Sequence, residues 1–497
     1  MKEFTLLTGA TGLLGQYLLR DLLARGLRVA VVARPSKTLD ARSRVDGIMS
    51  RWDRIEGRYL SRPVVLTGDL SSPGLGISRE ERIWLEKNCR AVVHNAASLS
   101  FTTGGPRTEE PWLGNVGGTT NLTSLARELG IPRFHHVSTA YTCGLRTGTV
   151  YETEGNRGQK FGNDYEESKL EAENIVRDAG FPESPTFFRP AIIVGDSRTS
   201  YTSTYHGFYT PLRVMASFMP MMQGMPPIPE SMWMMALGLQ GNESKNLVPV
   251  DWVSKVIAHI VSKDYWHGRT YHLTPANRVL VQEIAAVTKQ AIIAQYAKEK
   301  RVRQTQPQSS QVLESLANEF RQQMETYSAY WRDDPDFDAS NTLEAASELL
   351  CPNVDTAMLR RLCGFALREN FGWPRPIMQA PEFDVATKLA PADAAQRVSD
   401  WTEQKDECCI DFEVSGPGGG NWSVWAEGTE PRVGFPQPGK GPHVRTSSQA
   451  LMQMSRGRLT AKKAFQTGQL IVSKGEGDPY EAVQVIHKIF FQQEIVP

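Results

Sequence analysis

The sequence has no excess of charge of either sign, since 55 Lys and Arg residues balance 55 Asp and Glu residues among 497. A protein dedicated to binding nucleic acid needs a basic surplus, because it must displace the counterions that surround the phosphates. The balance therefore argues against that class of function. Hydrophobic residues make up 40% of the chain and charged residues 22%, which excludes an intrinsically disordered protein.

Cysteine is also scarce, with six residues in the whole chain. That number is too small for a disulfide framework, and the adjacent pair Cys408 and Cys409 fits no common zinc motif. The sequence has no apolar run of 18 residues, and its first residues enter a strand without a separate signal segment. We therefore expect a soluble, cytoplasmic protein from a reducing compartment.

Several motifs of catalytic sites are missing as well. The chain contains no H-E-x-x-H pair, no Walker A loop and no G-x-S-x-G turn around a nucleophilic serine. These absences argue against the corresponding zinc, nucleotide-phosphate and serine-nucleophile sites. We expect no metal site.

What the first third does contain is an alternation of short apolar runs with helical patterns. Between the runs lie segments with apolar residues three and four positions apart, such as 16–24 and 121–129, each closed by a glycine. Continuous apolar strands that alternate with helices indicate a parallel sheet covered on both faces, in the α/β class. The expected strands are 4–7, 28–33, 63–66, 91–94, 134–138 and 186–188.

The rest of the chain is organised differently. Eight of the 15 methionines lie between residues 215 and 235, in a stretch that prolines interrupt. Flexible thioethers suit an irregular apolar pocket, although ordinary core packing is the alternative. Residues 280–330 have helical spacing, and the Pro- and Ala-rich stretch 374–405 predicts a linker. Residues 406–497 then form a compact α+β pattern, with strands at 410–414, 422–426, 432–435 and 469–472 and a final helix at 481–491.

The segment TGATGLLG at 8–15 lies directly after the first expected strand and opens the first expected helix. Its glycines Gly9, Gly12 and Gly15 let the backbone approach a pyrophosphate closely, and a helix N-terminus offers free N–H groups and a positive dipole end. In this context of strand, turn and helix the motif predicts a dinucleotide site. The alternative is a tight turn that only packs the helix on the strand.

The end of the second expected strand indicates which dinucleotide is bound. A site for NAD expects an acidic residue there, whereas this strand leads into Arg34, followed by Ser36 and Lys37. A guanidinium pairs well with a 2′-phosphate, so the sequence favours NADPH. The alternative is that Arg34 is a solvated loop charge.

Tyr165 and Lys169 form a Y-x-x-x-K motif, in which residues four apart share one face of a helix. A nearby ammonium group lowers the pKa of a tyrosine towards a value useful for proton transfer. The motif follows an expected strand whose end, STAY at 138–141, would place hydroxyl groups at the carboxyl edge of the sheet, where ligands bind. A solvated helix face is the alternative interpretation of the motif alone.

The order of these motifs resembles an extended short-chain dehydrogenase/reductase over about residues 1–370. The motifs are TGATGLLG at 8–15, HNAA at 94–97, STAY at 138–141, YEESK at 165–169 and RPAIIVGDS at 189–197. Within that superfamily the chain most resembles acyl-thioester and fatty acyl-CoA reductases, through Arg34, VSTAY, FRPAIIVGDSRTS and NLVPVDWV. The resemblance implies a Rossmann-type, doubly wound parallel sheet with a helical substrate-binding cap from about residue 197 to 373.

The resemblance also implies roles for individual residues. Tyr165 would protonate the oxygen that receives hydride, Lys169 would bind the nicotinamide ribose and tune Tyr165, and Thr139 would bind the substrate with Ser138 as its competitor. Asn115 matches a helix asparagine of the superfamily. The residues expected to bind NADP are Gly9, Thr11, Gly12, Leu13, Gly15, Arg34, Asp69, Leu70, Asn95, Ala96, Ala97, Tyr165, Lys169, Arg189 and Pro190.

The last part of the chain resembles the sterol carrier protein-like lipid-binding fold, through SSQALMQMSRGRLTAKKAFQTGQLIVSKG at 447–475. That resemblance implies an apolar tunnel for an acyl or sterol tail. A structural or dimerisation module is the alternative. The expected organisation is thus a reductase domain at 1–373, a linker at 374–405 and a lipid-carrier-like domain at 406–497.

We therefore expect an NADPH-dependent reductase that converts an acyl thioester, carried by CoA or by an acyl carrier protein, into an aldehyde or an alcohol. Within the fold, the alternatives are a dehydrogenase or reductase of a sterol or 3-oxo lipid, and an epimerase or dehydratase of a nucleotide sugar. The apolar Met-rich segment argues against the sugar. A non-catalytic protein that senses lipid or cofactor is the alternative of another class, and the presence of Thr139, Tyr165 and Lys169 argues against it.

Overall fold

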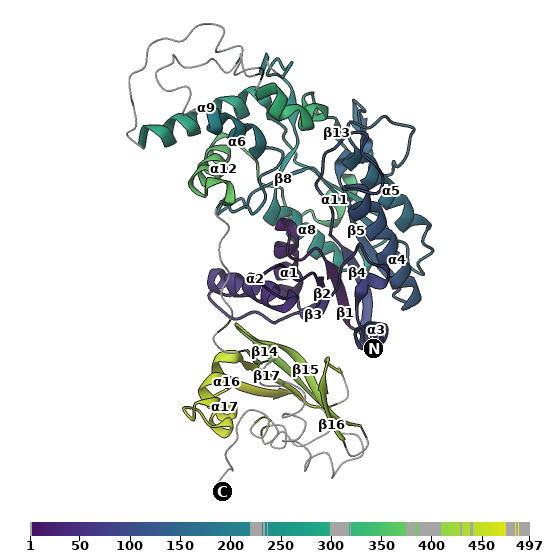
Figure 1. Cartoon of the computed structure of the whole chain (residues 1–497), viewed down its shortest axis with the longest axis vertical. Coiled ribbons are helices and arrows are strands. Elements are labelled where there is room, and N and C mark those ends of the chain that lie inside the picture. Colours follow the sequence, from purple (N-terminus) through teal and green to yellow (C-terminus); the bar gives the residue numbers. More distant parts are fainter. Residues whose placement is uncertain are drawn as a thin grey trace.

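Seven parallel strands form the central sheet, in the order β11-β7-β5-β4-β1-β2-β3 (Figure 1). This arrangement confirms the expected α/β fold with a doubly wound parallel sheet. The strands are β1 (Phe4–Thr8), β2 (Arg28–Ala33), β3 (Val64–Thr67), β4 (Cys89–His94), β5 (Arg133–Val137), β7 (Thr186–Pro190) and β11 (Thr270–Leu273). The computed structural model describes residues 2–218, 231, 234–235, 237–298, 318, 320–373, 381, 384–385, 409–427, 430–437, 441–473, 483 and 486.

The order of the strands reverses between β1 and β4. From β1 the chain proceeds to β2 and β3 on one side, and it then continues with β4, β5 and β7 on the other. Ligands of open α/β sheets bind beyond the carboxyl ends of the strands at such a switch point. The loops that follow Thr8 and His94, the last residues of β1 and β4, therefore frame the expected site.

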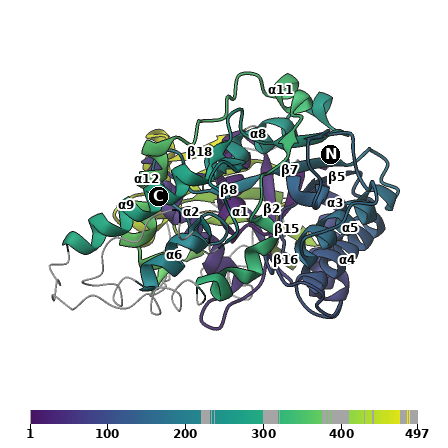
Figure 2. The ribbon, with the colours of Figure 1, turned by 90° about the horizontal axis from the view of Figure 1, so that it is seen from above.

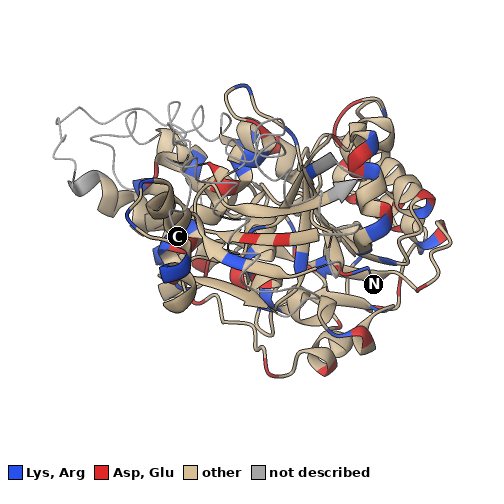
Figure 3. Ribbon diagram, turned by 90° about the horizontal axis from the view of Figure 1, so that it is seen from below, with Lys and Arg blue, Asp and Glu red and all other residues tan. Residues whose placement is uncertain are grey.

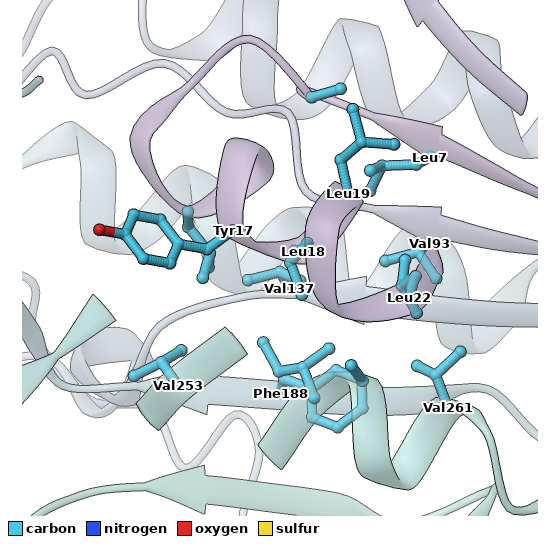
Figure 4. Close-up of a cluster of buried hydrophobic side chains, with 14 of the residues drawn as sticks. Leu7, Tyr17, Leu18, Leu19, Leu22, Val93, Val137, Phe188, Val253 and Val261 are labelled. Atoms are coloured by element: carbon cyan, nitrogen blue, oxygen red, sulfur yellow. The ribbon is translucent and has the colours of Figure 1, made fainter. Parts of the chain in front are cut away.

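Two apolar clusters cover the two faces of this sheet. One includes side chains of α1 (Leu13–Ala24), α2 (Ala41–Glu56) and α8 (Val250–Val261), and Figure 4 shows its centre around Leu18 and Phe188. The other includes side chains of α3 (Arg79–Asn88), α4 (Gly118–Glu128) and α5 (Asp164–Asp178). The two groups of helices lie on opposite sides of the strands in Figure 2. The strands are apolar on both faces because both faces are covered.

A second group of elements forms a cap beyond one end of the sheet. Its helices α6 (Tyr209–Phe218), α9 (Val281–Lys298) and α12 (Thr356–Arg368) lie together in Figure 1 around a separate apolar cluster. Short strands connect it to the core: β8 (Ile192–Val194) with β10 (Leu247–Pro249), β9 (Ser244–Lys245) with β12 (Val279–Leu280), and β6 (Thr149–Val150) with β13 (Asp336–Phe337). The remaining short helices are α11 (Ser340–Ala345), η1 (Pro73–Gly76), η2 (Leu113–Gly117), η3 (Ala140–Cys143), η4 (Asp264–Trp266), η5 (Glu325–Tyr330) and η6 (Asn370–Gly372).

The C-terminal unit is a five-stranded sheet in the order β16-β15-β14-β17-β18. Its elements are β14 (Cys409–Ser415), β15 (Gly420–Glu427), β16 (Glu430–Gly434), β17 (His443–Ser447), α16 (Ser448–Ser455), α17 (Ala461–Gln466) and β18 (Leu470–Ser473). One apolar cluster packs between this sheet and the two helices. Most of the expected linker at 374–405, most of the expected helix at 481–491 and five of the eight clustered methionines lie outside the described residues. The domain limits therefore stay a prediction.

The surface carries both signs of charge, and Figure 3 shows basic and acidic residues interspersed on the side of the C-terminal unit. Within the part of the chain that the structure describes, no helix has the length and apolar character needed to span a membrane.

Candidate functional site

A cavity of about 720 Å³ begins at the N-terminus of α1 and continues into the cap. Its walls come from the loops after β1, β2, β3, β4 and β5, from α5 and from cap residues up to Trp331. The expected site residues that line it are Gly9, Thr11, Gly12, Leu13, Arg34, Asp69, Leu70, Asn95, Ala96, Ala97, Ser138, Thr139, Tyr165, Lys169 and Pro190. The cavity therefore brings together residues from seven separate parts of the sequence.

The glycine turn leaves no room for side chains at two of its positions. Gly9 has a φ of +70°, and a Cβ there would lie 2.6 Å from the main-chain nitrogen of Ala96. At Gly15 a Cβ would lie 1.9 Å from the oxygen of Gly9, so this glycine lets α1 pack closely on the turn. Gly15 is not among the described residues that line the cavity, which differs from its expected contact with the cofactor.

The N-terminus of α1 opens into the cavity. Gly12 is its N-cap, and no side chain accepts a hydrogen bond from the first turn. The free N–H groups and the positive end of the helix dipole therefore face the space that Gly12 and Leu13 line. This arrangement fits a pyrophosphate, because it combines main-chain donors with a surface free of side chains.

Two arginines lie at the end of the cavity beside β2. The Arg34 side chain is 68% exposed, and its Nη1 lies 3.5 Å from Asp69 Oδ2. The Arg44 guanidinium donates a hydrogen bond to the main-chain oxygen of Arg34 and also lines the cavity. Burial, and then the neighbouring Arg34, lower the pKa of Arg44. Two guanidiniums against one carboxylate leave a local positive charge that suits an anionic group.

Ser36 and Lys37 have no part in this cavity wall. The Ser36 Oγ accepts hydrogen bonds from the main-chain nitrogens of Thr38 and Leu39, at 3.3 and 2.9 Å, and so stabilises the turn after β2. Arg44, which the sequence did not single out, lines the cavity beside Arg34 instead. Its distance of ten residues from Arg34 is bridged by the turn and the start of α2.

The loop after β4 forms the wall opposite the glycine turn. Asn95 Nδ2 donates to the main-chain oxygen of Gly9 at 3.3 Å, and the main-chain nitrogen of Ala96 donates to Thr8 Oγ1 at 3.3 Å. His94 bridges Thr8 and Thr119 through its two ring nitrogens, at 2.8 and 3.0 Å. Burial lowers the pKa of His94 to about 3, so the ring is neutral. Its role is to link the two threonines by hydrogen bonds, and it does not act as an acid.

Tyr165, Lys169 and Thr139 meet where the cofactor part of the cavity joins the cap. Thr139 Oγ1 donates to the main-chain oxygen of Pro190 at 3.4 Å and accepts from the main-chain nitrogen of Tyr141 at 3.3 Å. Burial raises the pKa of Tyr165 to about 12, and the neighbouring Thr139 hydroxyl opposes this shift. Lys169 Nζ donates to the main-chain oxygen of Val137 at 2.8 Å, and burial lowers its pKa to about 8. The three side chains share one wall because α5 presents both members of the Y-x-x-x-K motif to the end of β5.

Ser138 also lines the cavity, but it is the Thr139 hydroxyl that influences the pKa of Tyr165. Asn115 serves the loop after β4: its Oδ1 accepts from the main-chain nitrogen of Ser98 at 2.8 Å, and its Nδ2 donates to Ser168 Oγ at 3.0 Å. It therefore joins this loop to α5 from within the π-helical turn η2.

The structure directs Arg189 away from the expected position beside the nicotinamide. Its guanidinium pairs with the Glu173 carboxylate, with two contacts of 2.8 and 2.7 Å, and both side chains are buried. The neighbouring Pro190 does line the cavity. A strand alternates its side chains between opposite faces, so these two neighbours cannot both face the ligand.

The cap side of the cavity is aromatic and apolar. The Phe101 ring lies 5.0 Å from the Tyr165 ring, 5.3 Å from Tyr327 and 5.9 Å from Tyr330, between ring centroids. Beyond these rings most of the lining is apolar, and its polar members are Thr204, His206, Lys245 and Thr288. The apolar lining residues are Phe208, Pro211, Met215, Met234, Leu237, Leu239, Leu247, Val281, Ile284, Ala285, Phe320 and Met324. Two methionines of the Met-rich segment, Met215 and Met234, thus belong to the cavity wall.

A buried ion pair holds the aromatic part of this wall. Lys245 Nζ donates to the main-chain oxygens of Tyr330 and Arg332, at 2.6 and 2.7 Å, and to Asp334 Oδ1 at 2.9 Å. Asp334 Oδ2 accepts from the hydroxyl of Tyr141 at 2.7 Å. No local pattern singles out Lys245 or Asp334, since 89 positions separate them.

Among the residues that the structure describes, no group of three or more His, Cys, Asp or Glu side chains is arranged to hold a metal ion.

Comparison with known proteins gives a family match over residues 7–257, to the NAD-binding family described as "Male sterility protein". A fatty acyl-CoA reductase of Drosophila melanogaster, named wat, is 27% identical over 241 residues, which cover 42% of this chain and 46% of that protein. The chain thus matches less than half the length of this relative.

Two solved structures share the fold. The terminal R domain of the myxalamid PKS-NRPS biosynthetic pathway has a TM-score of 0.57 at 24% identity, over 74% of this chain and 92% of that chain. A thiolation-reductase di-domain of an archaeal non-ribosomal peptide synthetase has a TM-score of 0.54 at 16% identity, over 75% and 76%.

Proposed function

The chain belongs to this NAD-binding family, and we propose that it is an NADPH-dependent reductase of acyl thioesters. The observation that carries the proposal is that Thr139, Tyr165 and Lys169 line one cavity together, where the dinucleotide cleft meets an apolar chamber. The relative from Drosophila melanogaster is named a fatty acyl-CoA reductase, and a structural neighbour joins a thiolation domain to a reductase domain. Both names agree with a thioester carried by CoA or by a carrier protein.

A nicotinamide dinucleotide fits the described cleft. The N-terminus of α1 would bind the pyrophosphate, and Asn95 and Ala96 would border the ribose. Arg34 and Arg44 favour a 2′-phosphorylated form, because Asp69 neutralises only one of the two guanidiniums. The dinucleotide supplies the hydride, and the protein supplies orientation and charge.

The functional side chains would act on the carbonyl oxygen. When the carbonyl carbon accepts hydride, negative charge develops on that oxygen, and the hydroxyls of Thr139 and Tyr165 can donate hydrogen bonds to it. With a pKa of about 12, Tyr165 holds its proton at neutral pH and acts as the acid. The resulting hemithioacetal releases the thiol and leaves the aldehyde. Lys169, held at Val137, orients the ribose and stabilises charge on the phenol oxygen.

The cap supports an acyl group in preference to a sugar. The chamber beyond Phe101 is lined mainly by aliphatic, thioether and aromatic side chains. Its polar lining residues Thr204, His206, Lys245 and Thr288 are few for the many hydroxyls of a nucleotide sugar. A ketone on a sterol or a 3-oxo lipid would suit the same chamber and is the second candidate.

The experiment that tests this proposal offers the purified protein NADPH together with acyl-CoAs, 3-oxo lipids and nucleotide sugars, and follows nicotinamide absorbance. We expect oxidation of NADPH with acyl-CoA, with aldehyde and free thiol as products, and a loss of about 100- to 10,000-fold in Tyr165→Phe. If only the 3-oxo lipids are turned over, the proposed thioester reductase is wrong and the second candidate, a reductase of a sterol or 3-oxo lipid, takes its place. If the protein binds the dinucleotide but turns over none of these compounds, the non-catalytic sensor of lipid or cofactor would be favoured.

The lipid-carrier-like role of the C-terminal unit stays a prediction. Its apolar cluster contains Val414, Val424, Val444 and Leu451, with Val483 and Ile486 from the segment after β18. Titration of the protein with a fluorescent fatty acid, in competition with an acyl-CoA, would separate a second lipid site in this unit from binding in the reductase cavity.

A further inference from the structure

The C-terminal unit packs on the reductase core beside α2, β3 and α3 (Figure 1). Polar contacts join the two along this interface. Asn421 Nδ2 donates to the main-chain oxygen of Arg62 at 2.5 Å, Ser61 Oγ donates to Glu413 Oε1 at 2.5 Å, and Trp84 Nε1 donates to the main-chain oxygen of Pro436 at 2.7 Å. The unit is therefore docked on the part of the sheet that holds the adenosine end of the cleft.

One turn of this unit binds α2 directly. The glycine-rich turn 416–419, between β14 and β15, accepts two hydrogen bonds from Arg42 Nη2, at the main-chain oxygens of Gly418 and Gly419, both at 3.1 Å. The same nitrogen donates to Asp384 Oδ1 at 2.9 Å. In return, the main-chain nitrogen of Gly418 donates to Asp46 Oδ1 at 3.0 Å.

The turn depends on glycine. Gly416 and Gly418 have φ angles of +87° and +72°, which side chains rarely allow. A Cβ at Gly419 would lie 2.1 Å from the main-chain oxygen of Val414. The backbone of the turn can therefore approach α2 closely enough to bind both Arg42 and Asp46.

These two residues lie on the side of α2 opposite Arg44. Positions four apart share a face of a helix, and the position midway between them points about 200° away, at about 100° per residue. The turn thus holds α2 at Arg42 and Asp46, while Arg44 on the other side reaches the oxygen of Arg34 and lines the cavity.

Asp46 is also held from within the core. Arg62 Nε lies 3.4 Å from Asp46 Oδ1, and Arg62 Nη2 lies 2.6 Å from Asp53 Oδ2 on the same helix, with all three side chains buried. The far part of α2 is therefore anchored by the core itself. The start of α2 packs on the core through Ala41 and Val45, and its polar contact with the C-terminal unit is made by Arg42, at the turn 416–419.

We propose that the C-terminal unit completes the cofactor site, and that Arg42 is a positioning residue that holds Arg44 towards the 2′-phosphate of the dinucleotide. This inference rests on the proposed preference for NADPH. A unit that only packs on the surface would contribute to stability and leave the choice between the two dinucleotides unchanged. A unit that positions Arg44 contributes selectively to binding of the phosphorylated one.

The test measures binding of NADP⁺ and NAD⁺ to the full-length protein by isothermal titration calorimetry. In Arg42→Ala we expect the Kd for NADP⁺ to rise about three- to tenfold, with the Kd for NAD⁺ unchanged. Arg44→Ala should raise the Kd for NADP⁺ further, and the double variant should match it, because Arg42 acts through Arg44. Arg54→Ala is the control, since Arg54 is an exposed residue of α2 bound to the main-chain oxygen of Ser50.

A second variant covers the case in which Arg42→Ala fails to fold. Gly418→Ala changes only the turn, and it should shift NADP⁺ binding in the same direction. The inference is overturned if either variant folds and raises the Kd values for NADP⁺ and NAD⁺ equally. It is also overturned if a folded variant changes neither Kd. If Arg44→Ala itself leaves the ratio of the two Kd values unchanged, the preference for NADPH fails instead, and the two failures are thereby distinguished.

Discussion

Lys169 on α5 donates a hydrogen bond from Nζ to the main-chain oxygen of Val137, the last residue of β5, at 2.8 Å. This contact fixes the helix that carries Tyr165 against the strand that leads into Thr139. The ammonium group, the phenol and the threonine hydroxyl therefore share one frame, although they come from two separate segments. The relationship also buries the ammonium group, which lowers its pKa to about 8.

The pH dependence of the reaction should follow from this burial. Because the pKa of Lys169 lies near 8 and that of Tyr165 near 12, raising the pH first removes the proton of Lys169. We expect kcat/KM for the acyl thioester to fall above about pH 8 and to be flat between pH 6 and 7. Lys169→Met should be slower throughout and should lack this falling limb. A wild-type profile that stays flat to pH 10 would contradict the prediction.

Thr139→Val should test whether the Thr139 hydroxyl contributes to the reaction. The change keeps the volume of the side chain but removes the hydroxyl beside Tyr165, which is a donor to the developing negative charge. We expect kcat to fall about 100- to 1,000-fold, with little effect on dinucleotide binding. Thr142→Val is the matched control, because the Thr142 hydroxyl is buried nearby and donates to the main-chain oxygen of Thr139 at 3.2 Å. Equal losses in the two variants would argue against the assignment.

Glu173→Gln should test the buried pair with Arg189. Burial would raise the pKa of Glu173, but the Arg189 guanidinium outweighs it and lowers the pKa to about 2. Removing the negative charge leaves the buried Arg189 guanidinium without an opposite charge, although it keeps its hydrogen bond to the main-chain oxygen of Glu154. We therefore expect a loss of about 3–5 kcal/mol in the free energy of unfolding, measured in urea. Glu171→Gln on the same helix breaks an exposed pair with Arg107 and should cost less than about 1 kcal/mol.

The same pair predicts how stability changes with acid. A carboxyl group whose pKa is lower in the folded state stabilises the protein above its unfolded pKa, and this contribution is lost as pH falls towards the folded value. The contribution of Glu173 should therefore be complete above about pH 5 and lost between about pH 4.5 and 2. Over that range the stability of Glu173→Gln should fall less steeply than that of the wild type.

Gly12 and Gly15 should respond differently to alanine. At Gly15 the new Cβ would lie 1.9 Å from a main-chain oxygen, so we expect a loss of stability of about 1–3 kcal/mol or more. At Gly12 the nearest atom is 3.5 Å away, and the Cβ would enter the cleft beside the helix N-terminus. Gly12→Ala should keep its melting temperature and weaken the binding of NADP⁺ at least about tenfold. The new Cβ would disturb a hydrogen bond from the helix N-terminus to the pyrophosphate, and a hydrogen bond to a charged group contributes about 1.5–3 kcal/mol. Equal melting temperatures for the two variants would contradict this division.

Much of the seven-stranded sheet and its covering helices follows from local patterns. The alternation of apolar strands and helices predicts the parallel sheet, since strands covered on both faces are apolar throughout. Gly9, Gly12, Tyr165 and Lys169 can be singled out because turn geometry and helical spacing act over a few residues. The strand β11 was not expected, since its sequence TYHL mixes polar and apolar residues, and it joins the sheet by pairing with β7 more than 80 positions earlier.

The amino-acid sequence alone was enough for the parallel α/β sheet, the glycine turn and the spacing of Tyr165 and Lys169, because each depends on short-range geometry. Contacts between distant segments set the rest. Folding pairs Arg189 with Glu173, brings Lys245 to Asp334 under the cap, places Arg44 beside Arg34 and docks the turn 416–419 on α2. Such contacts cannot be predicted from the periodicity of the sequence, because the partner of a buried charge is set by which distant segments pack together.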